Sequence, residues 1–185
     1  TAYHLARAGL DVILLEKSPF PRDKICGDGL TPAAVHELIA MGVDTTGWMR
    51  NRGLTVIGGG HTVHMDWPDQ KSLPGYGMTR ARMDLDHALA QRAVEAGARL
   101  YEGVTVVGAI QDASGRVVGV TAKSGRGKNA TTTSVRASIV VDAGGPQRGL
   151  DEVTAHAHPL RVPRGGDVLV RDARRHLDAD AFDRC

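Results

Sequence analysis

The chain has 185 residues, which is enough for a buried core and corresponds to one domain and part of a second. Apolar residues make up 42% and charged residues 24%, so the composition is that of a folded globular protein and excludes disorder of the whole chain. The 23 Lys and Arg residues nearly balance the 21 Asp and Glu residues, and aromatic residues are only 4%. A nucleic-acid partner is therefore not expected, because both concentrated basic charge and aromatic rings for base stacking are lacking.

The patterns that hold metals or form disulfide frameworks are also lacking. The two cysteines, Cys26 and Cys185, lie far apart with no CxxC motif, so neither a disulfide framework nor a zinc knuckle is indicated. His61 and His64 are three positions apart on a predicted strand, which places them on opposite faces. The sequence thus predicts no metal site.

The first 16 residues read as half of a βαβ unit. Residues 2–10 have the apolar spacing of a helix, and residues 12–15 form an apolar run typical of a buried parallel strand. Glu16 follows at the carboxyl end of that strand, where dinucleotide-binding folds place the acidic residue that binds a ribose hydroxyl. The first strand and the glycine turn GxGxxG that should precede the helix are missing. Glu16 is either this ribose ligand or an ordinary charge at the end of a strand.

A loop and a capped helix come next. The two prolines of residues 18–29 exclude a helix or a central strand, so this segment is predicted to be a loop. Gly27 and Gly29 allow a ligand to approach the backbone closely, and Arg22 adds a cation beside it. Thr31 has the place of an N-cap before a proline at the first helical position.

Three segments carry a family resemblance: ARAGLDVILLEKSPFPRDKICGDGL, RARMDLDHALAQRAVEAGARLYEGVTVV and SIVVDAGGPQRGL. Together they resemble the geranylgeranyl reductase family of FAD-dependent oxidoreductases, within the wider group that includes para-hydroxybenzoate hydroxylase. The block FPRDKICGDGL is the most specific of these matches, and the other segments are shared by many flavoproteins. The resemblance covers residues 1 to about 150.

The resemblance implies a set of residues along one FAD molecule. They are Glu16 at the adenosine ribose, Arg22 in the loop, Cys26 and Gly27 on the flavin side, Arg82 at the phosphate and ribitol region, Val106 near the adenine, and Gly145 in the return turn. Many relatives have Asp-Gly where this chain has Gly144-Gly145, so a carboxylate contact is not implied there. No catalytic residue is assigned, because the flavin itself carries the hydride.

The expected fold class is α/β. It consists of an FAD-binding Rossmann-like parallel sheet with a β-meander, plus part of an inserted substrate domain. The expected strands are 53–57, 61–67, 76–79, 104–110, 117–122 and 135–141, and the best helix is 82–96. The expected domains are a partial FAD-binding domain at 1–52, the start of the substrate domain at 53–80, the continued FAD-binding domain at 81–150, and a divergent tail at 151–185.

The tail, residues 151–185, differs in character from the rest. It is dense in Arg, Asp and His and has little apolar pattern apart from residues 167–170. It is either a genuine divergent tail or the product of an out-of-frame reading of a GC-rich gene. With the missing first strand, this suggests a fragment that is inactive alone and poorly soluble or free of cofactor.

The expected function is that of an FAD-dependent oxidoreductase that reduces isoprenoid double bonds of a geranylgeranyl lipid or a prenylated quinone. Two alternatives stay open: a flavin monooxygenase or halogenase of the same fold acting on an aromatic substrate, and a non-catalytic fragment. The expected partners are a lipid or small-molecule substrate and an external electron donor, either NAD(P)H or a ferredoxin-like protein. Neither a secretory signal nor a membrane-spanning run is present in these residues, so the expected location is the cytoplasm, with peripheral membrane contact left open.

Overall fold

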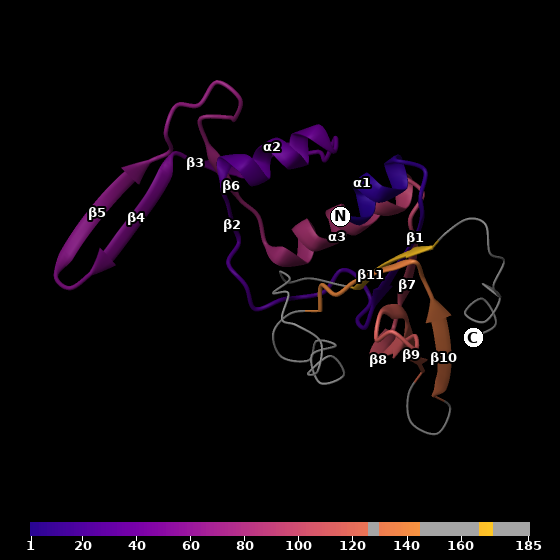
Figure 1. Cartoon of the computed structure of the whole chain (residues 1–185). Coiled ribbons are helices and arrows are strands. Elements are labelled where there is room, and N and C mark those ends of the chain that lie inside the picture. Colours follow the sequence, from indigo (N-terminus) through magenta and orange to yellow (C-terminus); the bar gives the residue numbers. More distant parts are fainter. Residues whose placement is uncertain (126–129, 145–166, 172–185) are drawn as a thin grey trace. The chain divides into compact units, whose positions relative to one another are not determined.

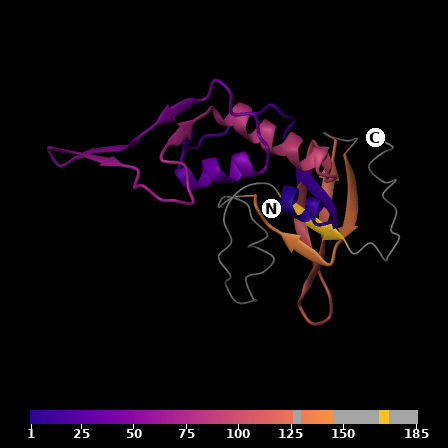
Figure 2. The same ribbon diagram turned by 90° about the horizontal axis from the view of Figure 1, so that it is seen from above.

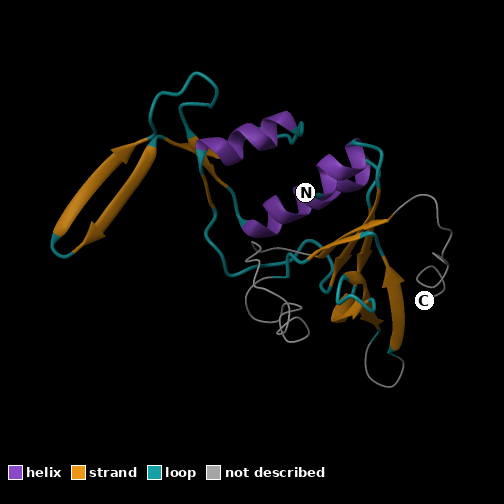
Figure 3. Ribbon diagram, viewed as in Figure 1, coloured by secondary structure: helices purple, strands orange, loops and turns teal. Residues whose placement is uncertain are grey.

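The structure is a computed structural model of the chain, and it describes residues 1–125, 130–144 and 167–171. The chain divides into two compact units. Unit 1 consists of residues 1–20 and 93–185, and unit 2 of residues 21–92. The described parts of both units contain helices and strands (Figure 3).

Unit 1 is built on a four-stranded sheet with the strand order β11-β12-β1-β7, and the short helix α1 contacts β1 (Figure 1). Its elements are α1 (Ala2–Arg7), β1 (Asp11–Glu16), β7 (Arg99–Glu102), β11 (Ile139–Val141) and β12 (Asp167–Arg171). Strand β1 is buried and pairs with β7 in parallel, as its apolar run predicts. The tail strand β12 pairs antiparallel with both β1 and β11, so the sheet is mixed rather than purely parallel.

A three-stranded meander with the order β10-β9-β8 packs in the same unit. Its strands are β8 (Val104–Gln111), β9 (Val117–Ser124) and β10 (Thr131–Arg136). The core shared by the sheet and the meander is formed by Ile13, Leu15, Val104, Val120, Ala122, Val135 and Ala137. The prediction of one strand over residues 135–141 is wrong, because the chain leaves the meander after Arg136 and enters the other sheet as β11. Burial of Val135 and Ala137 in the shared core favours this change of sheet.

Unit 2 contains a small sheet and helix α2 together with most of helix α3. Its strands and helices are β2 (Gly29–Leu30), α2 (Pro32–Ala40), β3 (Met49–Asn51), β6 (Gly77–Thr79) and α3 (Arg82–Glu95). Thr31 caps α2 as predicted, since its Oγ1 accepts a hydrogen bond from the backbone N–H of Ala34. Leu38 of α2 and Leu85 of α3 meet in a buried cluster with Val43, which holds the two helices together.

A two-stranded hairpin completes unit 2, formed by β4 (Gly53–Gly58) and β5 (His61–Asp66). It extends from the unit as a ribbon (Figure 2), and nearly all of its residues are exposed. Gly59 and Gly60 both have positive φ. A two-residue type I′ turn requires this at both positions, and its twist matches that of the two strands it joins. That residues 53–80 begin an inserted substrate domain stays a prediction.

Candidate functional site

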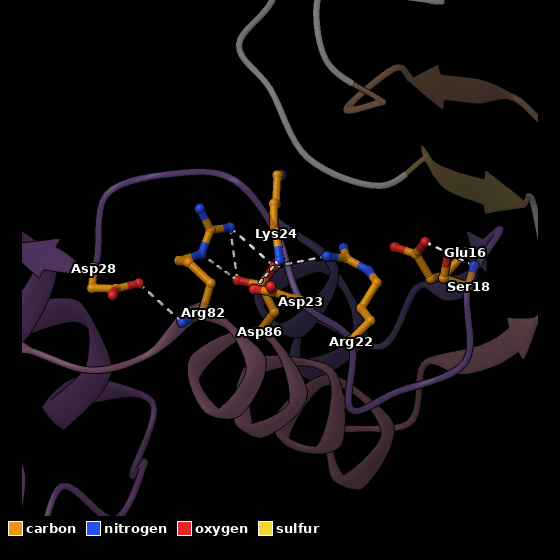
Figure 4. A network of polar contacts seen from close by, with 8 residues as sticks. All are labelled: Glu16, Ser18, Arg22, Asp23, Lys24, Asp28, Arg82 and Asp86. Carbon is orange, nitrogen blue, oxygen red and sulfur yellow. Dashed lines mark hydrogen bonds and ion pairs between the residues drawn. The ribbon is translucent and has the colours of Figure 1, made fainter.

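Glu16 is the only buried charged side chain among the residues that the structure describes, with 7% of its surface exposed. It is the last residue of β1, and its Oε1 accepts a hydrogen bond from the backbone N–H of Ser18 at 3.1 Å (Figure 4). Burying a carboxylate costs free energy unless it is hydrogen-bonded, so a charge that only keeps the surface soluble would not be expected at a buried strand end. The carboxyl end of a parallel strand is where nucleotide ligands bind in open α/β sheets.

The sequence reasoning missed a second carboxylate beside Glu16. Glu102 is the register partner of Glu16 at the end of β7, and its Oε1 accepts a hydrogen bond from the backbone N–H of Phe20 at 2.9 Å. The two carboxylates thus fix the chain that leaves β1. The repeated ending of the two strands, LLE and LYE, was the signal that could have identified this pair.

Two further predicted residues belong to unit 1. Val106 is half-buried on β8 and packs against the core, and the pairing with β9 shifts by one residue between Val106 and Gly108. Such a bulge disrupts the ladder locally and re-aims the strand, which is compatible with backbone contacts to a ligand there. Gly145 lies outside the described residues.

In unit 2, two predicted cations converge on one carboxylate (Figure 4). Arg82 donates from Nε to Asp86 Oδ1 at 2.8 Å and from Nη2 to Oδ2 at 3.0 Å. Arg22 donates from Nη1 to Asp86 Oδ2 at 3.2 Å. The three side chains are only 10–18% exposed. Guanidinium groups are the side chains best suited to bind phosphate oxygens in a paired geometry, so the two arginines are candidates for contact with a phosphate.

Asp28 ties the same loop to the start of α3. Its Oδ1 accepts a hydrogen bond from the backbone N–H of Arg82 at 3.2 Å, and its carbonyl oxygen accepts one from the N–H of Arg80 at 3.1 Å. A carboxylate is favourable at this place, because the first N–H groups of a helix have no partner within the helix. The loop of residues 21–29 is therefore attached to α3 near both of its ends.

The middle of the 21–29 loop is open. Cys26 is an exposed free thiol, so it is not an ordinary packed cysteine. Gly27 is exposed, and a Cβ added to it would meet no atom within 4 Å. Ile25 is also fully exposed, at 106% of its reference surface. A ligand could approach this backbone without displacing any side chain.

Unit 2 also contains a small apolar cavity of about 220 Å³ at the start of α2. It is lined by Thr31, Pro32, Ala33, Trp67, Pro68, Gln70 and Leu73. The indole N–H of Trp67 donates to Asn51 Oδ1 at 2.8 Å, which fixes the ring in the cavity wall. Within the part of the chain that the structure describes, no helix is both long and apolar enough to cross a membrane.

Comparison with known proteins defines the class. The sequence family described as FAD dependent oxidoreductase matches residues 73–183. The chain belongs to this family of enzymes, whose cofactor is FAD.

Individual relatives add detail. The chain is 43% identical over 141 residues to a protein named menaquinone reductase from Mycobacterium tuberculosis. The aligned region covers 74% of this chain and 33% of that protein. Among solved structures, a myxobacterial chondrochloren halogenase superposes with a TM-score of 0.62 and 25% identity, over 74% of this chain and 32% of the halogenase. A geranylgeranyl bacteriochlorophyll reductase-like protein from Thermoplasma acidophilum has a TM-score of 0.60 and 22% identity, over 75% of this chain and 34% of that protein.

These neighbours confirm the predicted α/β flavoprotein fold, and the chain spans about a third of the length of the menaquinone reductase. The side chains described above fit FAD. The buried Glu16 carboxylate suits ribose hydroxyl groups. The guanidinium groups of Arg22 and Arg82 suit a diphosphate, and the backbone at Gly27 is open to a ligand.

Proposed function

We propose that the protein is an FAD-dependent reductase of isoprenoid double bonds, acting on a prenylated quinone or a geranylgeranyl lipid. The 43% identity with menaquinone reductase over 74% of this chain is the observation that carries the proposal. The prenylated quinone is the favoured substrate class, because it is the one that this relative's name indicates. The narrower assignment to the geranylgeranyl reductase family is part of the same proposal.

The chain's own residues bind and orient the cofactor. Glu16 accepts hydrogen bonds from the adenosine ribose, and its burial strengthens them by excluding competing water. Arg82 and Arg22 bind the phosphate region, and the exposed Cys26-Gly27 backbone lies on the flavin side. Bound FAD supplies the hydride transfer.

The substrate and the electron donor follow from this chemistry. Reducing a carbon–carbon double bond consumes two electrons and two protons, so the flavin must be reduced again by NAD(P)H or by a ferredoxin-like protein. The small open pocket beside Trp67 is compatible with contact to an apolar group, since aromatic and aliphatic side chains line most sites for such groups. We place the protein in the cytoplasm, where it meets a lipid substrate at the membrane surface.

A second candidate function is that of a flavin halogenase or monooxygenase acting on an aromatic substrate. It is favoured by the 25% identity and the TM-score of 0.62 shared with chondrochloren halogenase. The two functions differ in what the reduced flavin reacts with: a carbon–carbon double bond of the substrate in one case and oxygen in the other.

One experiment separates the two functions. The whole protein is purified with FAD, reduced without oxygen, and mixed with a menaquinone. The proposal expects re-oxidation of the flavin and a product whose prenyl chain has gained two hydrogen atoms by mass spectrometry. A parallel sample receives tryptophan, bromide and oxygen. A brominated product there, with an unchanged menaquinone, would establish the second function instead.

A further inference from the structure

Asp86 of α3 stands at the centre of the charged cluster in unit 2. It accepts hydrogen bonds from Arg82, one turn earlier on the same helix, and from Arg22, which is 64 residues away in the sequence. Its carboxylate is only 10% exposed, so solvent screens these contacts less than it screens a surface ion pair. Asp86 thus joins the 21–29 loop to α3.

Asp28 makes the second attachment of the loop, at the N–H of Arg82. The two attachments flank the exposed residues Ile25, Cys26 and Gly27, for which no comparable contact is found within the described part of the chain. A loop fixed on both sides of an open segment loses less conformational entropy when a ligand binds to that segment. The same argument applies to the two arginine side chains, whose rotamers are already restricted by Asp86.

We propose that Asp86 is a positioning residue for FAD: it holds the guanidinium groups of Arg22 and Arg82, and through Arg22 it holds the loop that carries Cys26 and Gly27. This inference rests on the proposed function in that the ligand is FAD. It assigns to Asp86 a role that acts through other residues, without contact to the cofactor.

The sign of the effect distinguishes positioning from simple charge. FAD carries a negatively charged diphosphate, so removing a nearby carboxylate should tighten its binding if only long-range charge matters. If Asp86 positions the arginines, the substitution Asp86→Asn should instead weaken binding, because both guanidinium groups lose a charged partner that restricts their orientation. The two explanations therefore predict changes in opposite directions.

The chain offers a matched control. Asp84 lies on the same helix and pairs with Arg80 at the same spacing of four residues, at 2.8 Å. The pair is far more exposed, with side-chain exposures of 38% and 48%. The loop is bound to Arg80 through its backbone N–H, which Asp84→Asn leaves in place, and the Asp84 carboxylate has no contact with the 21–29 loop among the described residues. Asp84→Asn removes the same charge from the same helix.

The test uses the whole protein, freed of FAD and titrated with it while flavin fluorescence is followed. Asp86→Asn should weaken FAD binding about tenfold, Asp86→Glu should retain most of the affinity, and Asp84→Asn should match the unaltered protein. Without FAD, trypsin should cut after Lys24 faster in Asp86→Asn than in Asp84→Asn, since the loop has lost one attachment. Equal or tighter FAD binding in Asp86→Asn, with equal rates of cleavage, would overturn the inference.

A second variant covers the case in which Asp86→Asn does not fold. Arg22→Gln leaves the helical pair of Arg82 and Asp86 in place and removes the link from Asp86 to the loop, together with the guanidinium proposed to bind the phosphate region, so the cleavage rate is the readout that tests the link itself. It should also weaken FAD binding and speed cleavage after Lys24, and unchanged values for both would overturn the inference. If the unaltered protein binds no FAD, the proposed function fails, whereas the cleavage rates still decide whether Asp86 orders the loop.

Discussion

At the scale of single residues, the buried Glu16 is the side chain with the clearest need for hydrogen-bond donors. A carboxylate with 7% exposure must be satisfied by hydrogen bonds, and Ser18 supplies one of them. Ribose hydroxyl groups are suitable additional donors for such a carboxylate, because hydrogen bonds to charged groups are stronger than neutral ones. The role of Glu16 in FAD binding is therefore testable by removing its charge.

We expect Glu16→Gln to weaken FAD binding by about 1.5–3 kcal/mol, or roughly ten- to a hundredfold. The measurement is a fluorescence titration of the cofactor-free whole protein with FAD. Glu102→Gln is the matched control, because Glu102 is the register partner of Glu16 and also accepts a backbone hydrogen bond. If both variants lose the same affinity, the carboxylates serve only to hold the segment after β1, and Glu16 is no ribose ligand.

Residues differ in how far the sequence could predict them. Glu16 was identifiable because its place after a four-residue apolar run is local information. The spacing of Arg82 and Asp86 is also local, but the pairing of Asp86 with Arg22 is not, since it joins positions 64 residues apart. Asp86, and not Asp84, has the place of the aspartate in the family's R-x-x-(L/F)-D-x-x-L segment, but this match does not show that its carboxylate is the buried one of the two.

At the scale of elements, β1 is the strand on which the core of unit 1 depends. Ile13 is 2% exposed and packs with residues of the meander. Ile13→Ala should lower the free energy of unfolding by about 2–5 kcal/mol, because it removes buried methylene groups and leaves a cavity. Ile139→Ala, at a position that is 56% exposed, is the control in urea unfolding and should cost much less. Equal losses would show that β1 is not central to this core.

The turn between β8 and β9 should make stability depend on pH. The side-chain hydroxyl and the backbone N–H of Ser114, with the N–H of Arg116, donate to Asp112 and hold the pKa of this carboxyl below its usual value of 3.8. A lowered pKa in the folded state stabilises the protein above the usual pKa, and this stabilisation is lost as the pH falls through the lower, folded value.

We therefore expect Asp112→Asn to be less stable than the unaltered protein at neutral pH. The difference in the free energy of unfolding between the variant and the unaltered protein should shrink below about pH 4, because Asp112 of the unaltered protein becomes protonated there. Urea titrations at several pH values measure it. Ser114→Ala, which removes the leading cause of the shift, should show a smaller loss with the same trend. A difference that does not change with pH would contradict this account.

Elements were predictable to the extent that their pattern is local. Helix α3 was expected over 82–96 and is found over Arg82–Glu95, because its apolar spacing is regular. The strands β3 and β7 were not expected, since each is only three or four residues long and carries Arg. The split of residues 135–141 between two sheets also escaped prediction, because a strand that changes sheets keeps one continuous β pattern.

At the scale of the whole molecule, the fold class was predictable because the flavoprotein motifs are spread along most of the chain. The mixed sheet was not predictable from the sequence, because the antiparallel pairing of β12 with β1 joins segments from the two ends of the chain. The candidate FAD residues occur in both units, with Glu16 in unit 1 and Arg22, Gly27 and Arg82 in unit 2. Cofactor binding is therefore a property that must be measured on the whole protein.

The whole protein should be yellow as purified, with the absorbance of a flavin and with FAD released on denaturation. It should also select FAD over FMN, because FMN lacks the adenosine ribose that Glu16 is proposed to bind. A ligand that binds only the folded state at a free concentration of 100 times its dissociation constant stabilises it by about 2.7 kcal/mol. FAD should thus raise the melting temperature of the cofactor-free protein at concentrations where FMN has little effect. In Glu16→Gln this preference for FAD should become smaller. Equal stabilisation by FAD and FMN in the unaltered protein would show that the adenosine half contributes no binding and that Glu16 has another role.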